Sequence, residues 1–467
     1  MNNMQLHCKL NKVIIKKKVG DKMRSVYFTA EAFKADNDRL KTNLPFSDDV
    51  SILSEPEKIN GKTAHNRLVC QAMEGCDGTR GGMPDVLTKR RYERFAKGGA
   101  GIIWFEATAV MKEGRANPRQ LYICEENLDS FRREVESIKN TGIKENGYEP
   151  LIIMQATHSG RYSKPNGIPE PLIAYNNPIF EKNDPISSER IVKDEYLDRV
   201  GERLVNAALL AKRAGFDGVD IKCCHRYLNS ELLSAYERAG RYGGSLENRT
   251  RLLRESVAGA IQNCGGDFIV TSRLNVYDGF AYPYGFGVSE NGSLDFNPTE
   301  PVWLIKKLYE SGVRLLNISM GNPYFNPHVN RPFAAGPYAP DEEPLSGVTR
   351  VLSGTARLKR AVPEMKLVCS ALSFLGVAAP NTAAAYIKSG GFDFAGFGRT
   401  AFAYPDFAND IIKHGAMKKE KCCVACSKCT AIMRAGGTPG CPVRDREPYL
   451  EIYNKYVNKS YGEKSRR

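Results

Sequence analysis

The chain has 467 residues, 42% of them hydrophobic and 26% charged, which is ordinary for a soluble globular protein of one large domain or two to three smaller ones. Its formal net charge of +14 is dispersed, without an aromatic-spaced basic stripe or a nucleic-acid motif, so we interpret it as a solvated surface that also suits anionic cofactors or thioester substrates. The first 18 residues lack an apolar stretch of signal-peptide length and no run approaches a membrane span, which argues against secreted and membrane classes and predicts a cytoplasmic protein.

Short apolar, β-rich runs alternate with longer helical patterns along the chain. We expect eight strands, at residues 66–73, 101–108, 151–158, 218–224, 268–275, 314–321, 366–373 and 392–399. A helical pattern follows each strand, and several of these patterns end in a small turn just before the next strand. The clearest pattern ends at Gly215, as a helix stop should, and its apolar face carries Tyr196, Val200, Leu204, Ala208 and Ala211.

Regular alternation of strands and helices implies a parallel sheet with right-handed crossovers. Eight such units over about 330 residues favour a closed (β/α)8 barrel, the TIM-barrel fold, and an open doubly wound sheet is the alternative. We therefore expect a barrel domain over residues 55–420. Residues 1–54 lack the barrel pattern and are expected to form an N-terminal extension, and residues 421–467 form a cysteine-rich segment with a basic tail.

A barrel predicts that chemistry gathers at the carboxyl ends of its strands, with phosphate bound beyond strands seven and eight. Polar residues do collect there, because the third strand ends in QATHSGRY, the fourth in KCCHRYLNSELL, the fifth in SRLN and the eighth in GFGRTAF. The loops at 159–193 and 228–247 are long, which suits a substrate pocket with a lid.

At these positions the chain resembles the old yellow enzyme family of NADH:flavin oxidoreductases, and most closely its 2,4-dienoyl-CoA reductase-like branch. The resemblance is carried, in family order between about residues 55 and 445, by NRLVCQAM, FEATAV, QATHSGRYSKP, GFDGVDIKCCHRYLNSELL, RYGGSLENRTRLLRE, SRL and GFGRTAFAYPDF. No G-x-G-x-x-G motif follows a strand, so we expect a single-barrel form without the C-terminal FAD and NADPH domains of multidomain relatives.

The resemblance implies FMN as the cofactor. Gln155 and Arg273 match the family residues that fix the carbonyl and amide edge of the flavin and place positive charge near N1 and O2. The remaining matches are expected along the ring, at Ala72, Met73 and Ala107, and at the phosphate, at Ala371, Ser373, Gly398 and Arg399. Without the whole set, Gln155 would be read as a barrel-interior amide and each arginine as an ion-pair partner.

The fourth strand is expected to carry the substrate chemistry. Tyr227 matches the family's proton donor and His225 one of its carbonyl-binding residues, whereas Lys222 stands where many relatives carry another histidine. Lys222 would polarise an oxygen as a point charge or neutralise Asp220 or Glu74. His158 is equally a structural residue or a substrate contact, and His328 falls near a second catalytic histidine of the dienoyl reductases although the loop lengths differ.

Five of the thirteen cysteines lie within residues 422–441, a density that in a reducing compartment indicates metal or redox chemistry. Multidomain relatives carry a [4Fe-4S] motif of pattern C-x2-C-x3-C-x11-C at this point. Here the second interval is one residue short, and the implied ligands are Cys423, Cys426, Cys429 and Cys441, with Cys422 as an alternative first ligand. Spacing alone leaves a structural zinc site open.

These observations predict an FMN-dependent ene-reductase that reduces a C=C bond conjugated to a carbonyl in a small unsaturated carbonyl or enoyl thioester. The expected electron donor is NAD(P)H or an electron-transfer protein, no nucleic acid or membrane partner is expected, and the sequence is compatible with a homo-oligomer. Alternatives are oxidative demethylation of amines in the same branch, a flavin-free barrel lyase with Lys222 as Schiff-base nucleophile, and a non-catalytic electron carrier.

Overall fold

A closed barrel of eight parallel strands forms the centre of the molecule, in the order β10, β3, β4, β5, β6, β7, β8, β9. The computed structural model describes residues 25–458, so the predicted beginning of the N-terminal extension and the end of the basic tail lie outside the described residues. The strands are Leu68–Cys70 (β3), Ile102–Ala109 (β4), Leu151–Thr157 (β5), Gly218–Ile221 (β6), Ile269–Asn275 (β7), Leu315–Ser319 (β8), Lys366–Cys369 (β9) and Phe394–Phe397 (β10). Each overlaps one predicted strand, which confirms the (β/α)8 barrel, and the open-sheet alternative is wrong.

Continuous burial explains why these runs form an interior barrel. Every residue of β4 and β5 is buried, because helices cover the outer face of each strand and side chains fill the barrel inside. Strands β6 and β10 end earlier than the apolar runs suggested, at Ile221 and Phe397. The polar residues that follow them leave the ladder and build the loops at the carboxyl ends.

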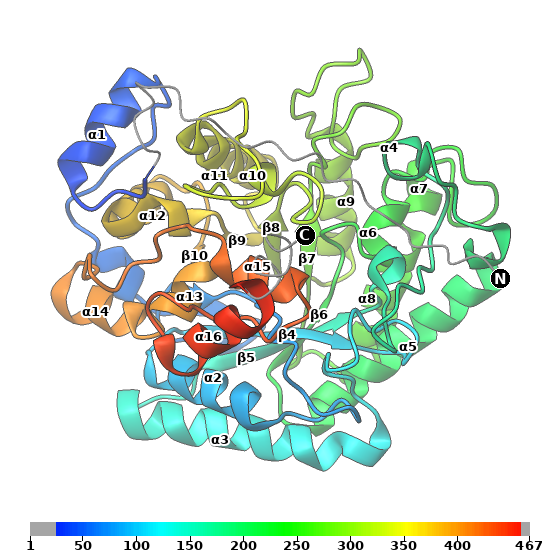
Figure 1. Cartoon of the computed structure of the whole chain (residues 1–467), viewed down its shortest axis with the longest axis horizontal. Coiled ribbons are helices and arrows are strands. Elements are labelled where there is room, and N and C mark those ends of the chain that lie inside the picture. The colour runs from blue at the N-terminus through cyan, green and yellow to red at the C-terminus, as the bar shows by residue number, and fades with distance from the viewer. Residues whose placement is uncertain (1–24, 459–467) are drawn as a thin grey trace.

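One long helix follows each strand and packs around the barrel (Figure 1). In chain order these are α2 Val86–Lys97, α3 Leu128–Asn146, α5 Asp194–Arg213, α8 Arg251–Cys264, α9 Thr299–Glu310, α11 Pro344–Ala361, α12 Ala379–Lys388 and α14 Phe407–His414. On α5 the predicted face is buried except for Tyr196, which is half-buried. The helix ends where expected, because Gly215 adopts a φ of +87° that favours glycine and turns the chain toward β6.

A hairpin closes the amino-terminal end of the barrel and was missed in the sequence. Its strands β1 Glu57–Ile59 and β2 Lys62–Ala64 are joined by Asn60 and Gly61, both with positive φ, which is the strongest short hairpin signal. Ile59 and Ala64 pack in one cluster with residues of the barrel strands, including Val69 of β3. The hairpin therefore plugs this end, and the opposite end is left for a site.

The part of the N-terminal extension that the structure describes is docked on the barrel. Its helix α1, Ala30–Arg39, buries Phe33 against Tyr27, with ring centroids 5.4 Å apart. The Val377 amide donates to the Tyr27 carbonyl, 3.0 Å away, and an added side chain at Gly376 would meet that same oxygen. This segment thus holds the loop η5, Leu372–Ala378, that follows β9.

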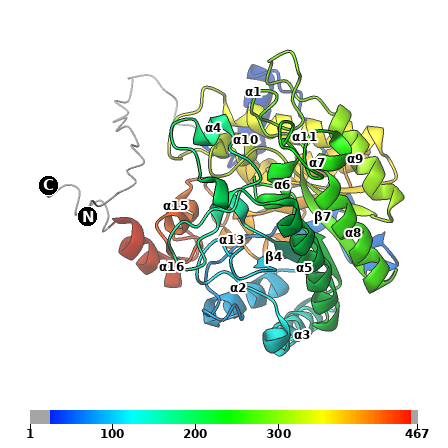
Figure 2. The same cartoon turned by 90° about the vertical axis from the view of Figure 1, so that its right-hand side faces the viewer.

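The cysteine-rich segment lies over the carboxyl ends of the strands, where its helices α15 Lys428–Arg434 and α16 Arg446–Tyr453 form one edge of the molecule (Figure 2). Asp445 anchors it through ion pairs with Arg90 and Arg94 of α2. The backbone of residues 334–335 also donates to the Ala425 carbonyl. The segment is therefore part of the wall at the functional end of the barrel.

Short elements complete the connections. They are α4 Pro178–Glu181, α6 Leu228–Leu232, α7 Leu246–Arg249, α10 Pro327–Asn330, α13 Arg399–Ala403, η1 Ser51–Ser54, η2 Glu125–Asn127, η3 Gly160–Tyr162, η4 Ser188–Arg190 and η6 Asn454–Asn458. Within residues 25–458, none of the helices combines the length and the apolar character that crossing a membrane requires.

Candidate functional site

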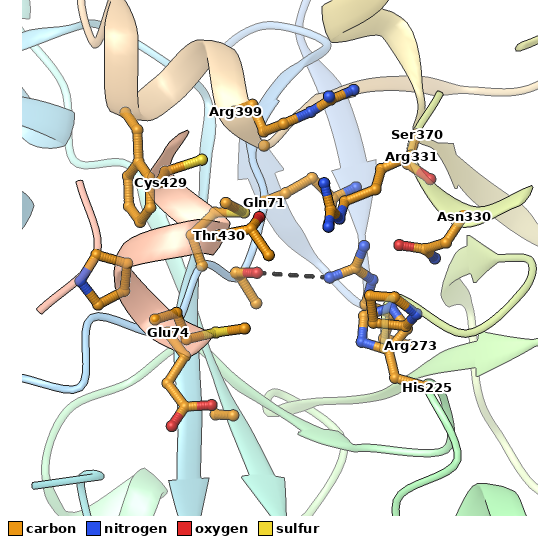
Figure 3. Close-up of a pocket in the computed structure, with 18 of the residues that line it drawn as sticks. Gln71, Glu74, His225, Arg273, Asn330, Arg331, Ser370, Arg399, Cys429 and Thr430 are labelled. Atoms are coloured by element: carbon orange, nitrogen blue, oxygen red, sulfur yellow. Dashed lines mark hydrogen bonds between the residues drawn. The ribbon is translucent and has the colours of Figure 1, made fainter. Parts of the chain in front are cut away.

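One pocket at the carboxyl ends of the strands brings together every residue that the sequence assigned to the flavin and to the substrate. Its lining atoms enclose about 1070 Å³, part of it open to solvent. Figure 3 shows Cys429 and Thr430 on one side and Asn330, Arg331 and Ser370 on the other. The twelve predicted residues that line it are Ala72, Met73, Ala107, Gln155, Lys222, His225, Tyr227, Arg273, Ala371, Ser373, Gly398 and Arg399.

A buried carboxylate organises the floor of this pocket. Asp220 accepts hydrogen bonds from Gln155 Nε2 and Trp104 Nε1, both at 2.7 Å, and from the Arg273 backbone amide at 2.6 Å. The Gln155 amide nitrogen is thus occupied, which leaves its side-chain oxygen to accept from a ligand. Arg273 is fixed by its backbone, and its Nη1 donates to the Ala72 carbonyl at 3.5 Å.

Three arginines face the pocket with unused donors. Arg273 Nε, Arg331 Nη2 and Arg399 Nη1 are buried and have no hydrogen-bond partner among the described residues. Burial and the neighbouring Arg399 guanidinium lower the pKa of Arg331. Glu74 is the only carboxylate among the pocket-lining residues that the structure describes, so this positive charge is not neutralised by the protein. An anionic ligand would satisfy it.

The turn after β6 directs His225 into the pocket. His225 has a φ of +65°, an uncommon backbone conformation for a residue other than glycine, and its Nε2 lies 3.2 Å from Ser319 Oγ of β8. Burial, together with the cationic Arg273, Lys222 and Arg331, holds the pKa of His225 well below its usual value. The imidazole is therefore neutral at physiological pH and acts as a hydrogen-bonding group rather than a charge.

Lys222 lies beneath the ring of Tyr227 and forms no ion pair with any described residue. Its Nζ is 3.4 Å from the ring centroid, a cation–π contact. Burial lowers the pKa of Lys222 to about 8, against the opposing influence of Cys224 and Glu74. Lys222 thus forms no ion pair with Asp220, which is engaged by Gln155 and Trp104. Burial raises the pKa of Glu74, and the charge of Lys222 offsets part of this rise.

Two tyrosine hydroxyls meet at the substrate side of the pocket. Tyr227 Oη lies 2.9 Å from Tyr324 Oη, and both residues line the pocket. Burial raises the pKa of Tyr227 well above its usual value, and Tyr324 and Glu74 raise it further. Tyr227 is therefore protonated at physiological pH.

The chain is similar to several known proteins. An NADPH dehydrogenase of Geobacillus sp. (strain WCH70) is 32% identical over 276 residues, which cover 58% of this chain and 73% of that protein. The model of the NADH:flavin oxidoreductase / NADH oxidase family matches residues 53–288. The chain belongs to this family. The sequence resemblance is thus confirmed, and the protein is an NAD(P)H:flavin oxidoreductase with FMN as cofactor.

Two longer proteins match more of the chain. A metal reductase of Desulforamulus reducens (strain ATCC BAA-1160 / DSM 100696 / MI-1) is 26% identical over 389 residues, which cover 81% of this chain and 51% of that protein. A 2-naphthoyl-CoA reductase solved with 2-naphthoyl-CoA superposes with a TM-score of 0.69 at 21% identity, covering 88% of this chain and 58% of the other. At that identity the superposition shows the shared fold alone, and the chain spans little more than half of either protein.

The hydrogen-bond donors of the pocket suit FMN, the cofactor of this family. The unpartnered nitrogens of Arg331 and Arg399 suit a phosphate, and that of Arg273 lies beside Gln155 and Ala72, where the sequence placed the flavin ring. Ser373 Oγ accepts from the Thr400 amide at 3.2 Å and from its hydroxyl at 3.0 Å, so its own proton is free to be donated.

Two histidines considered in the sequence lie outside the residues that line the pocket. His158 Nε2 is 2.8 Å from Tyr196 Oη and its Nδ1 accepts from the Gly160 amide, while burial lowers its pKa to about 4. His328 is hydrogen-bonded to Tyr338. The structural role of His158 is therefore the one that its contacts support.

The cysteines of residues 422–441 lie beside the pocket, which Cys429 itself lines. Cys423 Sγ accepts from the Ala425 amide and Cys441 Sγ from the Arg444 amide, each at 3.4 Å. Burial raises the pKa of both thiols, and Cys429 adds to this effect. In the described chain, no three histidine, cysteine or acidic side chains converge closely enough to hold a metal ion.

Sequence reasoning missed Tyr324 and Arg331 as pocket residues and named Glu74 only as a neighbour of Lys222. Tyr324 and Arg331 belong to the loop after β8, in the stretch NPYFNPHVNRP. In that loop, the sequence resemblance pointed only to His328, which falls near a second catalytic histidine of the dienoyl reductases. The loop's position after a barrel strand was the signal that could have identified the tyrosine and the arginine as well.

Proposed function

We propose that this flavin oxidoreductase is an ene-reductase that reduces a C=C bond conjugated to a carbonyl, with Tyr227 as the proton donor. The observation that carries the proposal is the convergence of Tyr227, His225 and Lys222 on the pocket that also holds Gln155 and Arg273. A buried hydroxyl that keeps its proton, beside polar groups able to hold a carbonyl oxygen, is what protonation of an activated alkene requires.

The flavin would be held by residues of three barrel strands and of the segments that follow four other strands. Gln155 and Arg273 would bind the edge of the ring, with Ala72, Met73 and Ala107 along it, and when bound FMN would supply the hydride to the β carbon. The phosphate would lie at Ala371, Ser373, Gly398, Arg331 and Arg399. Arg273 is placed to favour the reduced, anionic ring because its Nε has no partner in the described chain.

The substrate carbonyl would be oriented by His225 and Lys222. Neutral His225 donates one hydrogen bond, and Lys222, whose pKa is lowered to about 8 and which is therefore still mostly protonated at neutral pH, adds a charged donor. Polarisation of the oxygen makes the β carbon electrophilic. Tyr227 then breaks its O–H bond as the C–H bond at the α carbon forms, and solvent restores the proton.

We also propose that Cys423, Cys426, Cys429 and Cys441 hold a [4Fe-4S] cluster. Backbone N–H donors already point at Cys423 and Cys441, as is common for ligating sulfurs, and Ala425 and Ser427 adopt positive φ values that bend the backbone around the site. Cys422 instead donates to the Lys418 carbonyl, which favours Cys423 as first ligand. A cluster beside the flavin would supply single-electron transfer, from NAD(P)H-derived or protein-delivered electrons.

An anaerobic half-reaction separates the candidate functions. Reduced enzyme is mixed with a panel of enones, enoates and enoyl thioesters, and flavin oxidation is followed by absorbance. Rapid oxidation by at least one class, with the saturated product recovered, is the expected result. Reduction of the oxidised enzyme by small secondary or tertiary amines, with no response to the panel, would replace the proposal with amine oxidation.

A further inference from the structure

The loop after β8 holds Tyr324 rigidly against the proposed proton donor. The Tyr324 amide donates to Asn322 Oδ1 at 2.9 Å, and the Tyr324 ring packs on Tyr162 with centroids 4.1 Å apart. Asn322 Nδ2 in turn donates to Tyr162 Oη at 2.9 Å. These contacts fix the ring so that its hydroxyl stays 2.9 Å from Tyr227 Oη.

Glu74 approaches the same tyrosines from the loop after β3. Its carboxylate accepts from Asn117 Nδ2 at 2.9 Å, and Glu74 lines the same pocket as Lys222, Tyr227 and Tyr324. Burial raises the pKa of Glu74, and the Lys222 charge together with hydrogen bonds from Cys76, Asn117 and Tyr227 offsets part of that effect. Burial therefore favours the protonated carboxyl, which can hold a proton and release it.

We infer that Tyr324 and Glu74 form a proton supply for Tyr227, in which Tyr324 holds the donor hydroxyl in place and Glu74 returns the proton that Tyr227 gives up. The inference rests on the proposed function, because it needs Tyr227 to protonate substrate. Tyr324 and Glu74 are positioning and supply residues, since they act through Tyr227.

The proton balance closes without any further reagent. When the Tyr227 O–H bond breaks and the α C–H bond forms, a phenolate remains, with the Tyr324 hydroxyl as hydrogen-bond donor and Lys222 Nζ 3.4 Å from the ring centroid. The Glu74 carboxyl proton then passes to Tyr227, its hydrogen-bond partner, and solvent reprotonates Glu74. One proton is taken from solvent per turnover.

Simple packing would explain two buried tyrosines, but it does not explain the carboxyl beside them. An apolar neighbour would leave the Tyr227 and Tyr324 hydroxyls satisfied by each other, whereas Glu74 adds to the effect of burial in raising the pKa of both. A buried acid that disfavours the phenolate state is useful where the tyrosine must be reprotonated quickly.

The test is a double-mutant cycle on the holoenzyme, with 2-cyclohexen-1-one as the probe or another responding enone. Flavin oxidation is measured by stopped flow for Tyr227→Phe, Tyr324→Phe and the double variant. We expect Tyr324→Phe to slow oxidation roughly 10-fold, and the double variant to be no slower than Tyr227→Phe alone. Flavin reduction by NAD(P)H should be unchanged in Tyr324→Phe.

Tyr277→Phe is the matched control, because the buried Tyr277 hydroxyl donates to the Leu294 carbonyl and is not among the residues that line the pocket. A wild-type oxidation rate in Tyr324→Phe, or additive losses in the cycle, would overturn the inference while leaving the ene-reductase proposal intact. A wild-type rate in Tyr227→Phe would instead remove the proton donor and both ideas with it.

Glu74→Gln tests the supply separately, and flavin content measured by absorbance shows whether the variant folds. In the wild type, multiple-turnover rates should fall as rising pH deprotonates Glu74, and the variant should lose that dependence while its rate at low pH drops severalfold. The groups facing Glu74 are Lys222, Cys76, Tyr227, Tyr324, Glu106 and Arg115. An unchanged pH profile in Glu74→Gln would contradict the supply role.

Discussion

Arg331 and Arg399 reach one pocket from different loops, and each keeps one buried guanidinium nitrogen without a partner among the described residues. Arg399 begins α13 after β10, and its Nη2 donates to the Pro332 carbonyl at 2.7 Å, directly beside Arg331. Two guanidiniums so close repel each other, so a dianion between them would relieve the repulsion and satisfy both donors.

The arginine pair therefore predicts how affinity depends on the flavin phosphate. Arg331→Met and Arg399→Met should each weaken FMN binding by roughly 10- to 100-fold, since a hydrogen bond to a charged group contributes about 1.5–3 kcal/mol. Riboflavin, which lacks the phosphate, should bind these variants and the wild type alike. Fluorescence titration of deflavinated protein measures both, and equal losses for FMN and riboflavin would show that the arginines act elsewhere.

Arg273 should affect the reduction potential of FMN rather than the binding of its phosphate. Arg273→Ala is expected to make the FMN potential more negative by roughly 30–60 mV, because positive charge beside the reduced ring contributes about 1.5–3 kcal/mol. Arg273→Lys should restore part of the difference, and Arg399→Met serves as the control with lower occupancy and an unchanged potential. Spectroelectrochemistry at matched FMN content measures this potential. An unaltered potential in Arg273→Ala would show that Arg273 does not stabilise the reduced ring.

Substitutions of the three residues after β6 should affect different steps of the reaction. Tyr227→Phe is expected to slow oxidation of the reduced enzyme by substrate by on the order of 10²- to 10⁴-fold, while reduction by NAD(P)H stays nearly intact. Lys222→Ala and His225→Ala should instead weaken the binding of phenols or carboxylates to the oxidised enzyme, which shifts the flavin spectrum. If all three variants lose only ligand affinity, Tyr227 binds substrate without protonating it.

Much of this site follows from the sequence because barrel topology fixes where residues meet. Gln155 and Arg273 are 118 positions apart, yet both were placed at carboxyl ends of strands and both contact Asp220. Once eight strands are recognised, parallel closure brings such residues together whatever the loop lengths.

The residues that sequence reasoning missed depend on loop conformation instead. Tyr324 meets Tyr227 only because Asn322 and Tyr162 shape the loop after β8, and those contacts arise from residues far apart in the chain. The hairpin at Asn60 and Gly61 was missed for another reason. Its Asn-Gly turn is a clear local signal, but the strands on either side are much shorter than the apolar runs of the barrel.

The buried carboxyl of Glu134 should make the free energy of unfolding depend on pH, and this effect does not involve the flavin. This residue of α3 is buried, and burial raises its pKa to about 7 against the opposing charges of Lys89 and Arg91. A carboxyl with a raised folded-state pKa stabilises the fold below the unfolded pKa and loses that contribution as pH rises toward 7. The free energy of unfolding should fall by up to about 3 kcal/mol over this range.

Urea titrations between pH 4.5 and 8 measure this effect on the FMN-saturated protein. Glu134→Gln should flatten the dependence, whereas Glu136→Gln, at an exposed position of the same helix, should leave the wild-type slope. A parallel slope for wild type and Glu134→Gln would show that Glu134 is not the titrating group.

The cysteine-rich segment gives the last prediction. If Cys423, Cys426, Cys429 and Cys441 hold a cubane cluster, anaerobically purified protein should contain about four iron and four sulfide per chain, with broad absorbance that bleaches in air. Alanine at any of the four should abolish it. Cys422→Ala is the matched control at the neighbouring position, because the Cys422 thiol donates a hydrogen bond to the Lys418 carbonyl. Loss of iron in Cys422→Ala with retention in Cys423→Ala would show that Cys422 is the first ligand. Stoichiometric zinc without iron would show that the segment is a structural zinc site, and NAD(P)H would then reduce the flavin directly.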